Sequence, residues 1–599
     1  MTYKPISDYG VIGNMVTAAL VSRDGSIDWC CLPRFSSPSV FGSILDDDKG
    51  GFFRISPAEM LESQQEYVPD TNILQTTFRT RTGAATLTDF MPCYTQRNGR
   101  LTTPVQLHRM LRCDEGSVAF EALFQPRLNY GRGATSVTIA THGVTAKNDG
   151  GGLALSSKEE FRLDGPTAVS RFTLQTGQTT DFVLLHGAHA PMQTSSYHPS
   201  GGLEKTRTYW QELAADCTCG AHWRDAIVRS YLALHLLVYH PTGAMIAAAT
   251  TSLPEEIGGE RNWDYRFSWL RDASVTLDAF TRLGHKDEAI GYMRWLLAVC
   301  AERGPAGQIL FGIEPSDDLN EHILDHLNGY RDSRPVRVGN GAYRQRQLDV
   351  FGEVLEAAYN FTRIGGYVSQ STWNLLEDYV NAADTLWRMP DNGIWEVRGG
   401  PFHFVHSKMM CWVALDRGIR IATEMGYASD HLERWQQTAI DIREDILTKG
   451  WNEQLRSFTQ HYDTTALDSS LLLMPLLGFL PAGDDRMRAT IERVVDDLSV
   501  DGLLRRYRTE ETDDGLAGSE GAFLWCSYWL VLNLIRLNRV EEARSLYERL
   551  LSYRNHVGIY SEMVDGATGE ALGNTPQALS HLGVIVAGLE LADALRDPG

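Results

Sequence analysis

The chain has 599 residues, a formal net charge of −21 and a pI near 5.3. A chain this acidic repels phosphate backbones and anionic lipids, which excludes nucleic acids and membrane surfaces as expected partners and favours a small neutral substrate. Hydrophobic residues make up 43% and aromatic residues 10%, enough for packed cores and too many for a disordered chain. At about 100–200 residues per domain, the length predicts two or three domains.

Cysteine usage and the N-terminus indicate the compartment. The nine cysteines are irregularly spaced and form no Cys-x-x-Cys pair, which argues against zinc or thioredoxin-type chemistry and fits a reducing cytosol. MTYKPISDYG lacks the apolar core of a secretory signal, and the longest apolar stretch, 471–480, is ten residues long and contains a proline. We therefore expect a cytoplasmic protein with no metal or other cofactor. The sequence is also compatible with a homo-oligomer.

The first 200 residues have the pattern of strands. TNILQTTFRTRTGAATLTDF (71–90) and AVSRFTLQTGQTTDFVLLHG (168–187) alternate apolar and polar residues between turn residues. Many short strands of this kind pack as an antiparallel β-sandwich, predicted here over 1–200. A helical linker, containing LEKTRTYWQEL, is predicted over 201–221.

From His222 onward the periodicity is helical. It predicts twelve helices at about 222–240, 271–283, 286–302, 347–364, 371–388, 406–425, 430–447, 468–480, 485–497, 520–537, 540–553 and 576–594. Short connections alternate with six long ones, at 241–270, 303–346, 389–405, 448–467, 498–519 and 554–575.

This alternation predicts the architecture of the second domain. In an up-and-down helical array, alternate connections emerge at the same end, so a closed ring of six helical hairpins places every long loop at one mouth. We therefore expect an (α/α)6 barrel over 222–599 with a loop-built pocket. The competing interpretation, a helical solenoid, requires repeats of fixed period, and the sequence contains none.

Two of the long loops contain residues suited to sugar binding and acid catalysis. NWDYRFSWLRDA (262–273) combines Arg and Asp with Trp and Tyr, the donors, acceptors and ring faces that sugars require, although a capped helix with an ion pair explains it equally well. In DNGIWEVRGGPFHF (391–404), Glu396 follows Trp395. A carboxyl against an indole loses solvation, which raises its pKa and suits a general acid.

Further candidates lie in and around the second, fifth and sixth long loops. In GIYSEMVDGATGEALGNTPQALSHL (558–582), Glu562 and Glu570 lie near a predicted β-turn, and a general base needs such a polar setting. The stretches 326–359 and 505–530 bring arginines toward the same mouth. Glu520 has a simpler interpretation as a cap of the helix predicted to begin there.

Several of these segments, in order along nearly the whole chain, resemble glycoside hydrolase family 15, which contains glucoamylases, glucodextranases and trehalases. The opening DYGVIGNMVTAALVSRDGSIDWCCLPRFSSPSVFGSILD resembles the N-terminal β-domain of bacterial and archaeal members. WLRD, GIWEVRGGP, EGAFLWCSYWLV and YSEMVDGATGEALGNTPQALSHL resemble the catalytic barrel. The resemblance implies a β-sandwich followed by an (α/α)6 barrel.

The resemblance also implies residue roles. It makes Glu396 the general acid, Glu562 the general base, and gives substrate contacts to Tyr265, Trp269, Arg271, Asp272, Trp395 and Arg506. Phe402 and His406 depart from the residue types expected beside the acid, which leaves the leaving-group subsite and the linkage preference open.

The expected activity is exo-acting, inverting hydrolysis of small α-glucosides of the maltose or isomaltose type, releasing β-glucose. Trehalase action is the alternative, because it uses the same machinery. Some trehalases of the family are linked to phosphate and Mg²⁺, but no acidic cluster in this sequence requires a metal. A non-catalytic glucan-binding module is a third possibility that would predict loss of a carboxylate, and an inverting phosphorylase would dispense with Glu562.

Overall fold

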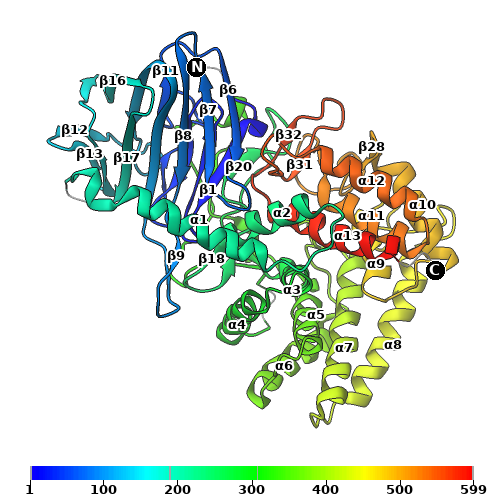
Figure 1. Cartoon of the computed structure of the whole chain (residues 1–599). Coiled ribbons are helices and arrows are strands. Elements are labelled where there is room, and N and C mark those ends of the chain that lie inside the picture. Colours follow the sequence, from blue (N-terminus) through cyan, green and yellow to red (C-terminus); the bar gives the residue numbers. More distant parts are fainter. Residues whose placement is uncertain (1–2, 188–189, 306–307, 597–599) are drawn as a thin grey trace.

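The computed structural model describes residues 3–187, 190–305 and 308–596. A sheet-rich N-terminal region and a helical C-terminal region lie side by side in it (Figure 1). The strands of the first region are β1 (Tyr9–Gly13), β2 (Ala18–Ser22), β3 (Ser26–Cys31), β4 (Ser39–Phe41), β5 (Phe52–Pro57), β6 (Glu62–Tyr67), β7 (Leu74–Arg79), β8 (Gly83–Phe90), β9 (Tyr94–Thr95), β10 (Leu101–Thr102), β11 (Gln106–Gln125), β12 (Ser136–Ala140), β13 (Gly143–Asn148), β14 (Gly151–Ser157), β15 (Arg162–Asp164), β16 (Thr167–Gln175) and β17 (Thr179–His186).

Strand β11 organises this region. It is 20 residues long. Its first half, from Gln106 to Arg112, pairs with β17 and β8, and its second half pairs with β5 and β16. A strand that changes partners in this way joins two layers of strands into one hydrogen-bonded network. The strands expected within 71–90 and 168–187 are present as β7, β8, β16 and β17.

The helical region follows α1 (Pro199–Ala215), which lies within the segment expected to connect the two regions. Its helices are α2 (Arg224–Leu237), α3 (Ala273–Arg282), α4 (Lys286–Arg303), α5 (Asp349–Arg363), α6 (Gln370–Leu386), α7 (Val405–Met425), α8 (Leu432–Lys449), α9 (Leu473–Leu476), α10 (Asp485–Leu498), α11 (Leu524–Arg536), α12 (Val540–Ser552) and α13 (Ala578–Arg596). Each matches one of the helices expected from the sequence, although the eighth begins as a 3-10 turn, Ser469–Leu472.

Alternate helices of this region contact one another in sequence. α3 packs on α5, α5 on α7, α7 on the 3-10 turn before α9, α9 on α11, α11 on α13, and α13 on α3 again. The remaining helices pack outside this closed series, for example α12 against α11 and α13. Each helix of the inner series begins where a long connection ends, so the long loops gather at one end of the series.

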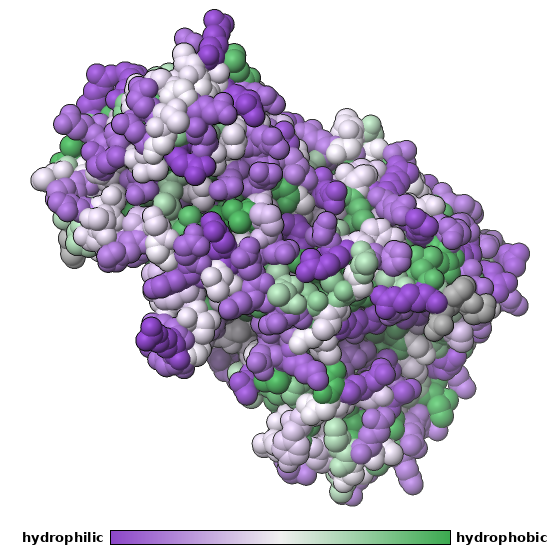
Figure 2. All heavy atoms as spheres, in the orientation of Figure 1, coloured by the Kyte–Doolittle hydropathy of each residue, from purple (hydrophilic) through white to green (hydrophobic). Residues whose placement is uncertain are grey.

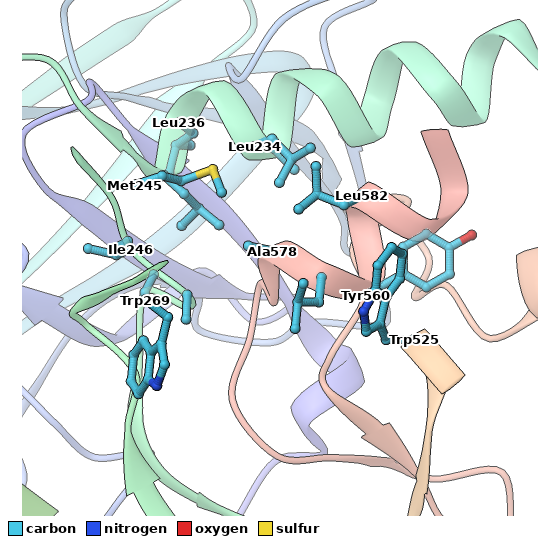
Figure 3. Packing of buried hydrophobic residues seen from close by; sticks show 14 of the residues in the cluster. Leu234, Leu236, Met245, Ile246, Trp269, Trp525, Tyr560, Ala578 and Leu582 are labelled. Atoms are coloured by element: carbon cyan, nitrogen blue, oxygen red, sulfur yellow. The ribbon is translucent and has the colours of Figure 1, made fainter. Parts of the chain in front are cut away.

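The inner helices are apolar on most faces because neighbours surround them. In α11, buried residues run without a break from Leu524 to Leu534. Among the described residues, α13 is long and apolar enough to cross a membrane by length and composition, and 72% of its most apolar window is buried inside the protein. Figure 3 shows α2 and α13 packing through Leu234, Leu236, Ala578 and Leu582 close to Trp269 and Tyr560.

The visible surface is mostly hydrophilic, with hydrophobic residues scattered over it in small groups (Figure 2). This agrees with the acidic composition, in which charged residues make up 22% of the chain.

Candidate active site

Two touching aromatic rings from the first long loop bring the predicted carboxyl pair together. Tyr265 lies between β21 (Asn262–Asp264) and β22 (Ser268–Trp269), and Trp269 ends β22. The Tyr265 hydroxyl donates a hydrogen bond to Glu562 Oε1 at 2.7 Å, and Trp269 Nε1 donates to Glu396 Oε1 at 2.7 Å. The ring centroids are 5.5 Å apart in an edge-to-face arrangement. Glu396 and Glu562 therefore lie at the same mouth of the helical region.

Glu396 is held in an unusual backbone conformation. Its φ is +62°, in the left-handed region, where a non-glycine residue needs support from its surroundings. The Gln345 side chain provides part of it by donating to the Glu396 carbonyl at 3.0 Å. Arg271 Nη1 donates to the Ile394 carbonyl at 2.8 Å and to Glu396 Oε1 at 3.2 Å. The side chain is thus aimed by its own turn and by two donors on one oxygen.

Glu562 is almost completely buried, at 2% exposed. It lies just before β31 (Met563–Val564), which pairs with β30 (Ala522–Phe523). Its Oε2 has no hydrogen-bond partner among the described residues. Burial raises the pKa of this carboxyl, while the charge of Arg506 and the hydrogen bond from Tyr265 oppose the rise. A buried carboxylate with one fixed oxygen and one unpartnered oxygen suits the binding of a water molecule.

The indole N–H of Trp395 is hydrogen-bonded to Asp468 and not to Glu396, its neighbour in sequence. Its Nε1 donates to both carboxylate oxygens of Asp468 at 3.0 Å. Its ring packs near Phe523 and Trp529, each at 6.0 Å between centroids. The indole with a hydrogen bond to Glu396 belongs to Trp269, so the sequence identified the carboxyl but not the tryptophan that contacts it.

Arg506 is buried in an ion cluster that the sequence did not reveal. Its guanidinium pairs with Glu255 Oε2 at 2.6 Å and with Glu520. Burial, together with the charges of Glu562 and Glu520, raises the pKa of Glu255 to about 8 against the opposing charge of Arg506. Glu255 stands in a Leu-Pro-Glu-Glu stretch with no motif or spacing that would have singled it out.

The prediction that Glu520 caps a helix is wrong. Helix α11 begins at Leu524, and its N-terminus has no side-chain cap. Glu520 precedes the short strand β30 and binds the Arg506 guanidinium through both carboxylate oxygens. The two-residue strand moves the start of the helix beyond the reach of this side chain.

Three buried titratable side chains, Asp272, Asp349 and His406, lie near Arg271. Arg271 Nε donates to Asp272 Oδ1 at 3.2 Å, and burial raises the pKa of Asp272. Both carboxylate oxygens of Asp349 and both ring nitrogens of His406 are buried without a hydrogen-bond partner among the described residues. Burial raises the pKa of Asp349 to about 7 and lowers that of His406 to about 3, so His406 is neutral near pH 7.

A small pocket opens beside Glu396. Its wall contains predicted site residues together with side chains from four of the long loops: Arg261, Trp263, Tyr265, Asn340, Ala342, Trp395, Glu396, Val397, Arg398, Arg506, Tyr507, Asp514 and Leu516. A larger cavity of about 1190 Å³ runs between the inner helices and also reaches Arg271 and Trp395.

Two other residues noted in the sequence lie away from the two carboxyls. Glu570 forms an ion pair with Arg331 at 2.7 Å and is partly exposed. Phe402 stacks on His461 with 4.5 Å between ring centroids. No group of three or more His, Cys, Asp or Glu side chains in the described ranges is arranged to hold a metal ion.

The N-terminal region makes hydrogen bonds to the first long loop. Arg266, next to Tyr265, is 2% exposed and donates from Nη1 to the Ser37 carbonyl at 3.0 Å. Its Nη2 pairs with Asp264 Oδ2 at 2.6 Å. Trp29 Nε1 donates to the Ala249 carbonyl at 2.8 Å. The β-rich region thus holds the segment from β21 to β22 that presents the two aromatic donors.

Replacing Arg266 by Met should lower the free energy of unfolding by about 3–5 kcal/mol, because Asp264 remains buried without its partner. The measurement is the urea midpoint followed by circular dichroism. Arg112→Met is the control, since Arg112 is 65% exposed in its pair with Asp114 and should change stability by less than about 1 kcal/mol. Equal midpoints for the two variants would contradict the bracing role.

Comparison with known proteins agrees with this geometry. Residues 221–589 match the model of glycosyl hydrolases family 15, and residues 2–176 match a trehalase-like N-terminal model. A trehalase from Thermoplasma volcanium is 38% identical over 99% of this chain and 94% of its own length. One from Mycobacterium tuberculosis is 39% identical over 97% of this chain and 89% of its own length.

A solved structure supports the fold. A bacterial glucoamylase complexed with acarbose superimposes with a TM-score of 0.73 at 14% identity, covering 99% of this chain and 94% of the glucoamylase chain. The sheet-rich and helical regions together therefore have a glucoamylase-like fold. By its sequence match over the whole helical region, its full-length relatives and its fold, this chain belongs to glycosyl hydrolase family 15 and is a glycosidase.

Proposed function

We propose that this protein is a trehalase that hydrolyses α,α-trehalose with inversion at one anomeric carbon. The full-length relatives named trehalase, from two different organisms, support trehalose over the maltose- and isomaltose-type substrates expected from the sequence. We place the activity in the cytoplasm.

The paired aromatic donors carry this proposal, because they fix two carboxyls at one mouth for different tasks. Glu396 protonates the glycosidic oxygen: two donors occupy its Oε1, which leaves Oε2 to hold the proton. Glu562 accepts a proton from water: Tyr265 fixes its Oε1, and the unpartnered Oε2 takes the water. That water attacks the anomeric carbon on the face opposite the leaving oxygen.

The remaining predicted residues position the substrate. Arg271 and Asp272 bind hydroxyls of the reacting glucose. Tyr265 lines the pocket, and Trp269 packs against Tyr265 edge to face in the same subsite. Trp395 and Arg506 form part of the cavity wall, and Glu255 and Glu520 orient the Arg506 guanidinium. This arrangement suits a β-sandwich packed on an (α/α)6 barrel, with the pocket at the loop end of the inner helices.

Proton NMR of early product from trehalose tests the function and the stereochemistry together. Inversion at the attacked carbon gives β-glucose, while the leaving ring is released as α-glucose, so the two anomers should form in equal amounts. Only α-glucose in the first product would exclude single displacement. No turnover of trehalose alongside turnover of maltose or isomaltose would return the substrate to the glucoamylase type.

A non-catalytic glucan-binding role is the competing proposal from another class. Such a module has no need for a buried carboxylate with an unpartnered oxygen, and Glu562 is a carboxylate of this kind among the described residues. Binding of trehalose without hydrolysis, with or without added phosphate and Mg²⁺, would favour it.

A further inference from the structure

One segment of the fifth long connection crosses the outer side of the cavity. We call residues 508–519 the strap. Half of its residues are exposed, but Asp514 at its centre is 2% exposed, and Leu516 lies in the cavity wall. The strap follows Arg506 and Tyr507 in sequence, and these two residues also line the cavity. The strap therefore forms part of the cavity wall and is anchored by one buried residue, Asp514.

The strap is joined to the turn that carries Glu396. The backbone N–H of Arg398 donates to the Asp514 carbonyl at 2.7 Å. Two glycines permit the close approach. A Cβ on Gly399 would lie 2.2 Å from the Asp513 carbonyl oxygen, and a Cβ on Gly515, whose φ is +76°, would lie 2.6 Å from the Arg398 carbonyl carbon. Side chains at these two positions would push the strap away from the turn.

The other end of the strap is joined to the first long loop. The N–H of Ala517 donates to Glu260 Oε1 at 2.6 Å. Ser519 donates to the Glu256 carboxylate from its N–H at 2.8 Å and from its hydroxyl at 2.6 Å. The centre and the C-terminal end of the strap are thus tied to the loops that carry Glu396 and the two aromatic donors, Tyr265 and Trp269.

The inner face of the strap completes the wall. The Asp514 carboxylate pairs with Arg261 at 2.8 Å and accepts a hydrogen bond from the Tyr507 hydroxyl at 2.8 Å. Outside Glu396, the Arg398 guanidinium lies 4.5 Å from the centre of the Trp263 ring and pairs with Glu321 at 2.8 Å. The charged groups of this part of the wall are therefore paired with one another, Asp514 with Arg261 and Arg398 with Glu321.

Building on the proposed function, we propose that the strap closes the leaving-sugar side of the site and restricts the enzyme to glucosides with a single leaving glucose. Asp514, Leu516 and Arg398 then determine specificity by their position, because a third sugar ring attached to the leaving glucose would collide with them. The same acid and base with this wall opened would accept longer substrates. Discrimination here comes from exclusion of the longer substrate as well as from binding the shorter one.

The test compares trehalose with glucosyl-trehalose, in which a third glucose extends one ring and the other ring can still enter beside Glu396. The wild-type enzyme should prefer trehalose by about 100-fold or more in kcat/KM. Gly399→Ala and Gly515→Val should each reduce this ratio by about 10-fold or more, mainly through a gain on the trisaccharide. Gly483→Ala is the control, because a Cβ at Gly483 meets no atom within 4 Å and this glycine does not have a positive φ.

A second variant tests the strap without changing a glycine, so that the proposal can still be tested if the glycine variants do not fold. Glu256→Ala with Glu260→Ala removes the side-chain anchors of Ala517 and Ser519 at partly exposed positions and should lower the ratio in the same direction. Wild-type enzyme that takes both sugars equally, or folded variants that lose both activities in proportion, would overturn the strap proposal. Absence of trehalose turnover in the wild type would instead overturn the proposed function, and maltose with maltotriose would then test the strap.

Discussion

Replacing Glu396 by Gln should reduce kcat for trehalose by about 10²–10⁴-fold, the usual contribution of a general acid. The amide keeps the hydrogen-bonding shape of the side chain at this left-handed turn but has no proton to give to the glycosidic oxygen. The leaving sugar then departs as an alkoxide, which is the difficult step. Circular dichroism and thermal unfolding should match the wild type, so the loss is one of chemistry.

A change of leaving group separates the acid role from a structural one. α-Glucosyl fluoride needs little help from an acid because fluoride leaves without full protonation. Glu396→Gln should therefore retain most of the wild-type rate on the fluoride. Glu570→Gln serves as the control, since Glu570 pairs with Arg331 away from the two carboxyls and should be active on both substrates. Equal losses on trehalose and the fluoride would remove Glu396 from the acid role.

Replacing Glu562 by Gln should reduce turnover by a similar factor, about 10²–10⁴-fold, on trehalose and on the fluoride alike. Both reactions need a water activated on the face opposite the leaving group. Azide at high concentration should restore part of the rate and form β-glucosyl azide, since a small anion needs no base. Restoration that yields the α-azide, or a variant with normal turnover, would exclude Glu562 as the base.

The acid side of the pH–rate profile provides a further check on Glu562. Burial raises the pKa of this carboxyl, and the base must be ionised to act. Activity should therefore fall as the pH drops through a value above the ordinary range of a glutamate. Tyr265→Phe removes a hydrogen bond that stabilises the ionised form, so the fall should move to higher pH.

Features with a local cause could be predicted from the sequence. The inner and outer helices follow from the alternation of short and long connections, because a connection of a few residues forces neighbouring helices to lie antiparallel. The positions of Glu396, Glu562, Tyr265 and Trp269 at one mouth follow from the same alternation, together with the family resemblance.

Features that depend on distant contacts could not be predicted in this way. Glu255 and Glu520 meet on Arg506 although Glu255 is 251 residues from it in sequence. Asp468 accepts the hydrogen bond from the indole N–H of Trp395. The indole that donates to Glu396 belongs instead to Trp269, in another loop. β11 serves two layers of strands because its partners change halfway along, and its alternating sequence has no sign of this exchange. In each case the decisive partner lies in a segment with no spacing relation to the residue.

Arg266 and Ala249, in the first long loop, are hydrogen-bonded to the β-rich region. This attachment has a consequence for the evolution of the enzyme. In this chain the helical region and the loops that carry the two carboxyls are not an independent module, because the loop bearing Tyr265 and Trp269 is hydrogen-bonded to the β-rich region. Fusion, truncation or recombination at the boundary between the regions would separate the reacting groups from their support. The two regions are therefore expected to be inherited together as one catalytic unit.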